Sequence, residues 1–570
     1  MFIRKNDLRV LNEIASGVSE RDAGRSFRSE AMMLYLNGLV RFVDDKVELT
    51  DAGKVLLDAV RGADIESLPE VVVDSAAVEA LRLWTETGIV PDEWKRFLAN
   101  RGLVDGEDMN ALGRAVLEAY ERARPVFVLT NEVISFLSTV PPLGTYDDLV
   151  EFTELGGYGK NVVAALQAMR LLRISPPTGG RASYVITPAA KKLLEAMGHS
   201  PKVVVSITFG PEEAAAVDAE KVIESLLFSG MADEGGITEF GRLMREAYRL
   251  TTERRKLIAP VFLSREEHDV LEAIREIQQI HRKTPSIVSD YNTIRERLEK
   301  MESPAAEDLG EHLHMLEAKG FIFRGEEDGK FVYLLTDEGR KALAFGPVRA
   351  EAVKAVAYAH AGELPLARWI DIAREDGVLA TYVTDKGSFY LEHSKKRPDV
   401  VYITGYDAAV VSKVPREKYI LFDDLVRAVA EYYEDDEELA RRAVEIAESK
   451  NLIDILPNAA VRLTERGDRL KDIVEMAKSR EFIHTRFAVT PLAYSIVVEM
   501  YENADEVNRI WKKAYDKKKD FYGELAKWLT NRVRASVEDV VKTLEILHKI
   551  GIVGEKSLTD AGKKLAEILK

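Results

Sequence analysis

A short pattern of apolar and polar residues recurs along the whole chain. An apolar residue is followed by Thr, two variable residues, Gly and a basic residue, and an amphipathic stretch comes next, as in residues 49–54 before residues 55–60. The Thr can accept a hydrogen bond from the free amides of a first helical turn, and an acidic residue after it suits the positive end of the helix dipole. Each copy, here named the Thr–Gly junction, therefore predicts a strand end followed by a capped amphipathic helix.

The Thr–Gly junction occurs about eight times. Two copies change a key residue, because Ala190 stands in place of Gly and Asn110 in place of Thr. We expect the Gly to let the start of the helix pack closely against a neighbouring backbone. The copies occupy residues 49–54, 109–114, 186–191, 237–242, 335–340, 383–387, 463–468 and 558–563.

A helix, a Gly turn and a strand pair precede several of these junctions. In the first copy, residues 30–37 have a helical pattern, Gly38 follows, and two short apolar stretches flank Asp44 and Asp45. Residues 319–322 and 550–553 repeat the Gly turn. Gly directly after a helix is typical of a left-handed helix end. The recurring unit is therefore predicted to be helices, a Gly turn, a β-hairpin and a capped helix.

This order of elements resembles the winged-helix domain, and its Gly-turn, hairpin and junction sequence is similar to archaeal and MarR/PadR-type regulators. The resemblance is closest over residues 30–60, 309–345 and 537–569, and it extends to residues 162–197 and 440–477. The whole chain resembles an uncharacterised, mainly archaeal family of long multi-winged-helix proteins. The resemblance implies an architecture but no settled activity.

The predicted fold class is mainly α with small β-hairpins (α+β), as an elongated tandem array of winged-helix domains. A longer period is also present, since the segment that starts at Trp94 parallels the segment that starts at Trp369. Full and degenerate units therefore alternate in the prediction. The predicted winged helices are residues 1–62, 126–198, 261–347, 401–478 and 479–570, the last with a long basic helix, and the predicted degenerate winged helices are residues 63–125, 199–260 and 348–400.

Composition narrows the classes of function. The chain of 570 residues has no Cys, which excludes disulfides, thiolate nucleophiles and zinc sites with Cys ligands. Its 31% of charged residues is typical of proteins from hot environments. No apolar run reaches the roughly 20 residues of a membrane span, and the first residues lack the apolar core of a signal peptide. We therefore expect a cytoplasmic protein that does not contact membranes.

No catalytic or metal-binding constellation stands out. Residues 156–161 only superficially resemble a phosphate-binding loop, because the spacing and the Ser or Thr after Lys160 are missing. His312 and His314 are two residues apart and so do not share a helix face. We expect a non-enzymatic protein with no cofactor and no metal, although an enzyme with an unrecognised carboxylate site stays open.

One stretch near the end of the sequence combines basic and aromatic residues. Its only acidic members are Asp516, Asp520 and Glu524, and five aromatic residues interleave. Such a combination fits phosphate contacts and base stacking. The alternatives are an amphipathic helix with buried aromatics and solvated lysines, or a dimerisation helix. The predicted nucleic-acid-binding residues are Arg509, Lys512, Lys513, Lys517, Lys518, Lys519, Lys527, Trp528, Arg532 and Arg534.

A second candidate set lies in the third predicted unit. The third helix of a winged helix usually enters a groove of nucleic acid, and Lys160, Asn161 and Arg170 belong to that part of the sequence. The alternative is that this unit serves only as a scaffold.

The formal net charge of −16 confines phosphate contacts to local basic patches. We expect a macromolecule-binding regulator or adaptor that contacts nucleic acid or a ribonucleoprotein such as the ribosome. A DNA-binding transcription regulator is one alternative. A protein-only scaffold or dimerisation protein is the other, and it would have a protein partner or form a homodimer.

Overall fold

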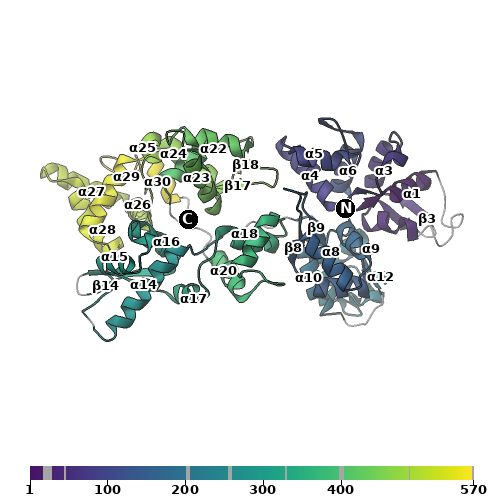
Figure 1. Cartoon of the computed structure of the whole chain (residues 1–570), viewed down its shortest axis with the longest axis horizontal. Coiled ribbons are helices and arrows are strands. Elements are labelled where there is room, and N and C mark those ends of the chain that lie inside the picture. The colour runs from purple at the N-terminus through teal and green to yellow at the C-terminus, as the bar shows by residue number, and fades with distance from the viewer. Residues whose placement is uncertain are drawn as a thin grey trace. The chain divides into compact units, whose positions relative to one another are not determined.

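The structure is a computed structural model, and it is mostly helical with small antiparallel sheets (Figure 1). It divides into two compact units. Unit 1 comprises residues 1–258 and 354–384, and unit 2 comprises residues 259–353 and 385–570. The residues described are 1–16, 29–43, 46–200, 206–253, 258, 260–284, 286–327, 330–396, 403–486, 488–533 and 535–567.

Unit 1 contains short strands that alternate with helices of one to four turns. Residues 29–36 are also helical. Its elements are β1 (Ile3–Arg4), α1 (Lys5–Ala15), β2 (Val40–Val43), β3 (Lys46–Leu49), α3 (Asp51–Val60), η1 (Ile65–Ser67), β4 (Val71–Val73), α4 (Ser75–Thr87), α5 (Asp92–Ala99), β5 (Val104–Asp105), β6 (Asp108–Met109), α6 (Ala111–Arg122), β7 (Phe127–Thr130), α7 (Asn131–Thr139), β8 (Leu143–Thr145), α8 (Tyr146–Leu155), α9 (Lys160–Ala168), β9 (Leu172–Ile174), β10 (Ser183–Ile186), α10 (Pro188–Met197), β11 (Ser206–Phe209), α11 (Pro211–Asp218), α12 (Glu224–Ser229), β12 (Ala232–Asp233), β13 (Gly236–Ile237), α13 (Glu239–Arg249), most of α18 (Ala350–Ala361) and α19 (Ala367–Glu375).

Unit 2 has longer helices and fewer strands. Its elements are α14 (Arg265–His281), α15 (Tyr291–Lys300), η2 (Pro304–Ala306), α16 (Leu309–Ala318), β14 (Ile322–Glu327), β15 (Lys330–Leu335), α17 (Asp337–Phe345), α20 (Asp385–Lys396), α21 (Gly405–Lys413), β16 (Ile420–Leu421), α22 (Phe422–Ala430), α23 (Glu437–Ser449), β17 (Ile453–Ile455), β18 (Ala460–Leu463), α24 (Glu465–Met476), α25 (Ser479–Ile483), α26 (Pro491–Glu502), α27 (Ala504–Asp516), α28 (Phe521–Val533), α29 (Val537–Lys549) and α30 (Asp560–Glu567).

The Thr–Gly junctions fold as the sequence predicts. At the first one, the Thr50 hydroxyl accepts a hydrogen bond from the Gly53 amide and donates to the carbonyl oxygens of Gly38 and Leu39. One side chain therefore caps the new helix and ties it to the turn before the hairpin. The residues whose side chain caps the helix in this way are Thr50, Asn110, Thr187, Thr238, Thr336, Thr464 and Thr559.

The Gly of the junction is required by close backbone contact. A Cβ atom added to Gly339 would lie 1.9 Å from the carbonyl oxygen of Phe321, and one added to Gly467 would lie 1.8 Å from that of Leu452. Carbon and oxygen atoms that are not bonded cannot approach so closely. The predicted close approach of the helix start to its neighbour is confirmed.

The helix end that precedes each hairpin has a left-handed residue. In six copies this residue is Gly, and in the other two it is Arg170 and Asn451, with φ of 59° and 57°. Asn tolerates this conformation better than most residues, whereas Arg adopts it at a cost. The six Gly are Gly38, Gly102, Gly230, Gly320, Gly377 and Gly551.

Two modules have a third strand and the same element order. In residues 131–197, helices α7, α8 and α9 combine with strands in the order β8-β10-β9. In residues 405–476, helices α21, α22 and α23 combine with strands in the order β16-β18-β17. In both modules the first strand precedes the second helix and pairs with the last strand. The two halves of the chain therefore contain matching modules.

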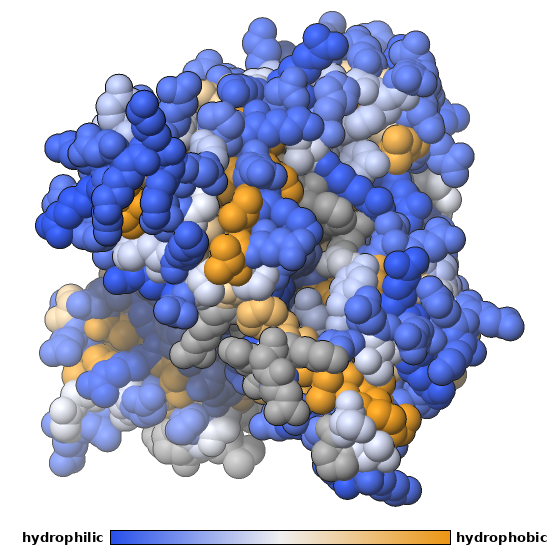
Figure 2. All heavy atoms as spheres, turned by 90° about the vertical axis from the view of Figure 1, so that its left-hand side faces the viewer, coloured by the Kyte–Doolittle hydropathy of each residue, from blue (hydrophilic) through white to orange (hydrophobic). Residues whose placement is uncertain are grey.

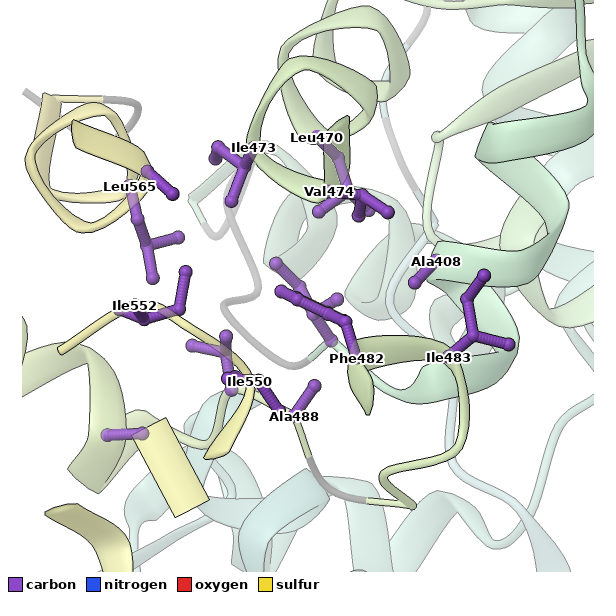
Figure 3. Close-up of a cluster of buried hydrophobic side chains, with 14 of the residues drawn as sticks. Ala408, Leu470, Ile473, Val474, Phe482, Ile483, Ala488, Ile550, Ile552 and Leu565 are labelled. Atoms are coloured by element: carbon purple, nitrogen blue, oxygen red, sulfur yellow. The ribbon is translucent and has the colours of Figure 1, made fainter. Parts of the chain in front are cut away.

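Adjacent predicted segments share hydrophobic cores. In unit 2 one cluster extends from Ile403 to Ala566, and Figure 3 shows Phe482 and Ile550 below Leu470 and Val474 of α24 in this cluster. In unit 1 a second cluster extends from Met33 to Tyr248. Hydrophilic residues cover most of the face in Figure 2. The segments predicted as single winged helices thus bury their apolar faces together with their neighbours.

No helix in the described part of the chain is long and apolar enough to cross a membrane.

Candidate nucleic-acid interface

The basic and aromatic stretch forms two helices, α27 and α28, joined by a short turn (Figure 1). Val507 and Ala514 lie seven residues apart on α27 and are buried, which makes this helix amphipathic. The turn ends at Asp520, whose carboxylate accepts hydrogen bonds from the amides of Tyr522 and Gly523 and so starts α28. Most of the basic residues therefore lie on the exposed side of α27 and in the turn after it, whereas Lys527 and Arg532 lie on α28.

Four lysines of this stretch are exposed and have no carboxylate partner among the described residues. Their side chains are exposed, and within the described part of the chain none of them lies within ion-pair distance of a carboxylate. Two come from the last turns of α27 and two from the turn that follows. These lysines are Lys512, Lys513, Lys517 and Lys518. We name these four lysines, together with Trp511 and Tyr515, the basic tip.

The basic tip also presents an exposed aromatic ring. Tyr515 is 73% exposed, and its ring stacks on Trp511 with 5.4 Å between ring centroids and 24° between planes. Lys556 lies over the Trp511 ring at 4.6 Å. Water-exposed aromatic rings beside unpaired lysines are the arrangement on which unpaired bases stack.

The remaining residues of the predicted set are engaged by carboxylates or by the core. Glu524 pairs with Lys527 at 3.0 Å and with Lys519 at 3.6 Å, and these lysines lower the pKa of the Glu524 carboxyl. Trp528 is half-buried against the unit 2 core, and the guanidinium of Arg532 covers its ring at 4.5 Å. These four side chains are less available to phosphate than the basic tip.

Two predicted arginines complete the set. Arg509 pairs with Glu506 at 2.9 Å, one helical turn away, and Arg532 also reaches Glu499 at 3.2 Å. Arg534 lies outside the described residues. The sequence prediction of ten residues therefore reduces to four lysines that have no acidic partner among the described residues.

The second predicted set does not form one surface. Asn161 is exposed in the first turn of α9, and Lys160 begins that helix, although its side chain lies outside the described part. Arg170 is only 9% exposed and donates hydrogen bonds to the carbonyl oxygens of Tyr120 and Ala123. Its position is therefore not the groove-facing one that the sequence predicts, because the chain has already turned away from α9 at this left-handed residue.

The histidine pair has no metal-binding geometry. Burial, reinforced by the nearby Arg324, lowers the pKa of His314 to about 4. His314 lies on α16 and packs inward. Among the residues described, no group of three or more His, Asp or Glu could hold a metal ion.

The comparisons with known proteins identify a family. A family model described as Protein of unknown function (DUF505) matches residues 1–307 and again residues 305–569. The chain belongs to the DUF505 family. The Uncharacterized protein MJ1355 of Methanocaldococcus jannaschii is 32% identical over 574 residues, which cover 100% of this chain and 99% of that protein. No solved structure matches the chain.

The two DUF505 copies account for the repeated junctions. Each copy contains four Thr–Gly junctions, and the three-stranded module surrounds the third of them in each copy. The sequence prediction of an internally repeated chain is thus confirmed at this coarser level.

The basic tip lies on an insertion in the second DUF505 copy. In the first copy, α11 begins at Pro211 and α12 ends at the Gly230 turn before the last hairpin. In the second copy, α26 begins at Pro491 and α29 ends at the Gly551 turn before the last hairpin. Between α26 and α29 lie α27 and α28, whereas α12 follows α11 directly. Sequence reasoning found the charges of this segment but not that it is an addition to the repeat.

Proposed function

We propose that this DUF505 protein is a non-enzymatic adaptor that binds nucleic acid with unpaired bases, as in single-stranded RNA or a ribonucleoprotein, through the basic tip. One observation carries the proposal: four exposed lysines without a carboxylate partner among the described residues lie within three residues of an exposed, stacked tyrosine in the sequence. Lysines supply phosphate contacts, and an aromatic face accepts any base.

We also propose that the repeated modules are winged helices. The support for this proposal is the order helix, strand, helix, helix, strand, strand in both three-stranded modules, with the first strand beside the last, because this is the order expected of a winged helix. The other modules keep the hairpin and the capped helix. In this interpretation the modules serve mainly as a scaffold for the inserted helices.

The helices that would enter a DNA groove are poorly suited to that role. In α9 the basic Arg170 just beyond its end is buried, and Gln167 accepts hydrogen bonds from the Ser75 amide and hydroxyl. In α23 the exposed residues include Glu437 and Glu438. Carboxylates repel the phosphates that flank a groove. Contact through the basic tip is therefore favoured over sequence reading by a DNA-binding regulator.

The test measures the affinity of the full-length protein for a fluorescein-labelled single-stranded RNA by anisotropy at several salt concentrations. Replacing the four lysines of the basic tip with Ala should raise the Kd by on the order of 100-fold, at roughly 0.5–1 kcal/mol for each lost surface charge contact. The slope of log Kd against log salt should fall by about 3, at about 0.7 per phosphate contact on a single strand.

A matched control removes the same number of charges elsewhere. Lys54, Lys395, Lys542 and Lys563 each pair with a carboxylate three or four residues away. Replacing these four with Ala changes the net charge equally and should leave the Kd within about threefold. Equal losses in both quadruple variants would show that total charge, rather than the basic tip, decides binding.

Stacking gives an independent readout. Tyr515→Ala should weaken binding by about 5- to 100-fold, at about 1–3 kcal/mol per stacked base, without changing the salt slope. Tyr515→Phe should retain most of the affinity. Tighter binding to duplex DNA than to single-stranded RNA would support the transcription-regulator alternative, and no binding to either would leave the protein-scaffold alternative.

A further inference from the structure

Four arginines line one cavity of unit 1, which we name the arginine cavity. Its volume is about 340 Å³, within the range of small-molecule sites. Its walls come from α4, the end of α6, β9, the start of α10, the residues after α13 and the residues after α18. The four arginines are Arg82, Arg124, Arg170 and Arg173.

Two of these arginines are neutralised by carboxylates. Glu79 pairs with Arg82 at 2.6 Å and with Arg173 at 3.0 Å, and Glu363 lies 3.4 Å from Arg173. Burial alone would lower the pKa of the Arg173 guanidinium, but these two carboxylates outweigh it and raise the pKa. Arg82 and Arg173 are therefore structural members of the cavity wall.

The other two arginines have no such partner. Arg170 donates only to the carbonyl oxygens of Tyr120 and Ala123, with its guanidinium 4.0 Å from the centre of the Tyr120 ring. Arg124 is exposed and also donates only to carbonyl oxygens. Within the described chain no carboxylate lies within ion-pair distance of either guanidinium. Because a guanidinium stays charged, the cavity holds two positive charges that the described residues do not neutralise.

Arg170 has an unfavourable backbone conformation, with a φ of 59°. It takes the left-handed turn position that Gly occupies in six other modules. The equivalent residue of the second DUF505 copy is Asn451, and Asp454 stands there in place of Arg173. Arg170 and Arg173 therefore have no arginine counterpart in the second DUF505 copy. Backbone strain of this kind clusters at functional and ligand-binding sites.

The rest of the lining includes the start of a helix and two further carboxylates. Thr187 and Pro188 begin α10, so the positive end of this ten-residue helix faces the same space. The carboxylates of Glu121 and Glu253 also line the cavity, and both side chains are exposed. Glu253 lies 3.4 Å from Arg249.

We propose that the arginine cavity binds a small phosphorylated molecule, a phosphomonoester no larger than about a mononucleotide. The two unneutralised guanidinium groups match the double negative charge of a phosphomonoester. Planar guanidinium groups bind phosphate oxygens with paired hydrogen bonds. This site lies in unit 1 and does not depend on nucleic-acid binding by the basic tip in unit 2.

The test measures binding of adenosine monophosphate and of inorganic phosphate to the full-length protein by isothermal titration calorimetry. The informative variant is Arg170→Asn, which installs the residue of the second copy and suits the left-handed backbone. It should weaken adenosine monophosphate binding by about 10- to 100-fold, as expected for lost charge-assisted hydrogen bonds. The control, Arg61→Asn, removes an exposed arginine that does not line the cavity, and this variant should bind as the unaltered chain does.

Each outcome decides the proposal. Succinate should bind at least tenfold more weakly than adenosine monophosphate, and equal binding would overturn the phosphate assignment. Unchanged affinity in Arg170→Asn, or no binding of either phosphate compound by the unaltered protein, would overturn the site. Where Arg170→Asn fails to give the circular dichroism spectrum of the unaltered protein, the exposed Arg124→Gln replaces it, with the same expected weakening.

Discussion

Replacing Gly339 with Ala tests whether the Thr–Gly junction depends on close backbone contact. The added Cβ atom would lie 1.9 Å from the Phe321 carbonyl oxygen and 2.9 Å from its carbonyl carbon. Favourable contact needs roughly 3.5 Å, so the start of α17 and the residue before β14 must separate by more than an ångström. The Phe321 oxygen also accepts hydrogen bonds from the amide and the hydroxyl of Thr336, at 3.0 and 3.1 Å. The separation therefore breaks the junction itself.

The size of the effect follows from three contributions. Two lost hydrogen bonds cost about 1 kcal/mol each, and forcing the added methyl group into a packed place costs about 1–3 kcal/mol. Ala is about 1 kcal/mol more favourable than Gly inside a helix. We therefore expect Gly339→Ala to lower the free energy of unfolding by about 2–4 kcal/mol.

Urea unfolding followed by circular dichroism measures this change, with Gly310→Ala as the matched control. Gly310 lies in α16 of the same unit, and an added Cβ would meet nothing within 4 Å. The control should be unchanged or more stable by up to about 1 kcal/mol. If the two variants are equally stable, the Gly of the junction is not there for close packing, and the explanation given for the seven copies with Gly fails.

Two further predictions concern buried ionisable groups of unit 2. The pKa of His314 is about 4 in the folded chain, below its ordinary value of 6.5. Between these two pH values the unfolded chain binds a proton at His314 that the folded chain does not bind. The free energy of unfolding should therefore fall by up to about 3 kcal/mol as the pH drops from 6.5 to 4. His314→Gln should lose that part of the pH dependence in urea unfolding at pH 7 and 4.5, and an unaltered dependence would contradict the low pKa. Lys319 pairs with the equally buried Glu267 at 2.6 Å, and burial lowers the pKa of the lysine. Glu267→Gln should therefore lower the free energy of unfolding by about 3–5 kcal/mol at pH 7, because it leaves the lysine charge buried without a partner. Replacing both residues with Met should lower it much less. Equal losses of stability in the two variants would show that the buried ion pair does not explain the effect.

The elements that could be predicted from the sequence are those that local chemistry determines. The Thr–Gly junction is confirmed because a cap, a Gly and an amphipathic stretch all lie within about ten residues of one another. The strand pairs that the sequence did not predict join distant segments: Ile3 pairs with Val73, and Phe127 pairs with Phe209. Such short strands carry little pattern of their own, and only tertiary contact decides their partner.

In the candidate interface, too, the sequence predicted what local residues determine and not what tertiary contacts determine. Charge counting located α27 and α28, but it could not separate the free lysines from those that carboxylates engage. Part of that separation was available in the sequence, since Glu506 and Arg509, and likewise Glu524 and Lys527, have the three-residue spacing of helical ion pairs. Lys556, which covers Trp511, had no such signal because it comes from a distant turn.

Arg170 was misplaced for a different reason. Its sequence neighbours have a helical pattern, and this led to a prediction on the exposed face of the third helix. The two residues after the turn are apolar in every copy, as in Leu39 and Val40 after Gly38, and Leu171 and Leu172 follow Arg170 in the same way. An alignment of the modules by these apolar pairs would have placed Arg170 at the Gly turn, where a side chain is carried away from the helix surface. The repeat itself therefore contained the information that the residue pattern of a single module lacked.

The boundary between the two DUF505 copies and the boundary between the two units do not coincide. The family copies meet near residue 305, yet residues 354–384 of the second copy belong to unit 1. Arg173 links this segment to the one that it repeats, because it pairs with Glu79 in α4 and with Glu363 just after α18. These two helices occupy equivalent places in the two copies. Unit 1 thus uses both versions of one repeat element around a single three-stranded sheet, and the arginine cavity forms where they meet. The cavity lining takes residues from both DUF505 copies, which gives the duplication a structural consequence beyond added length.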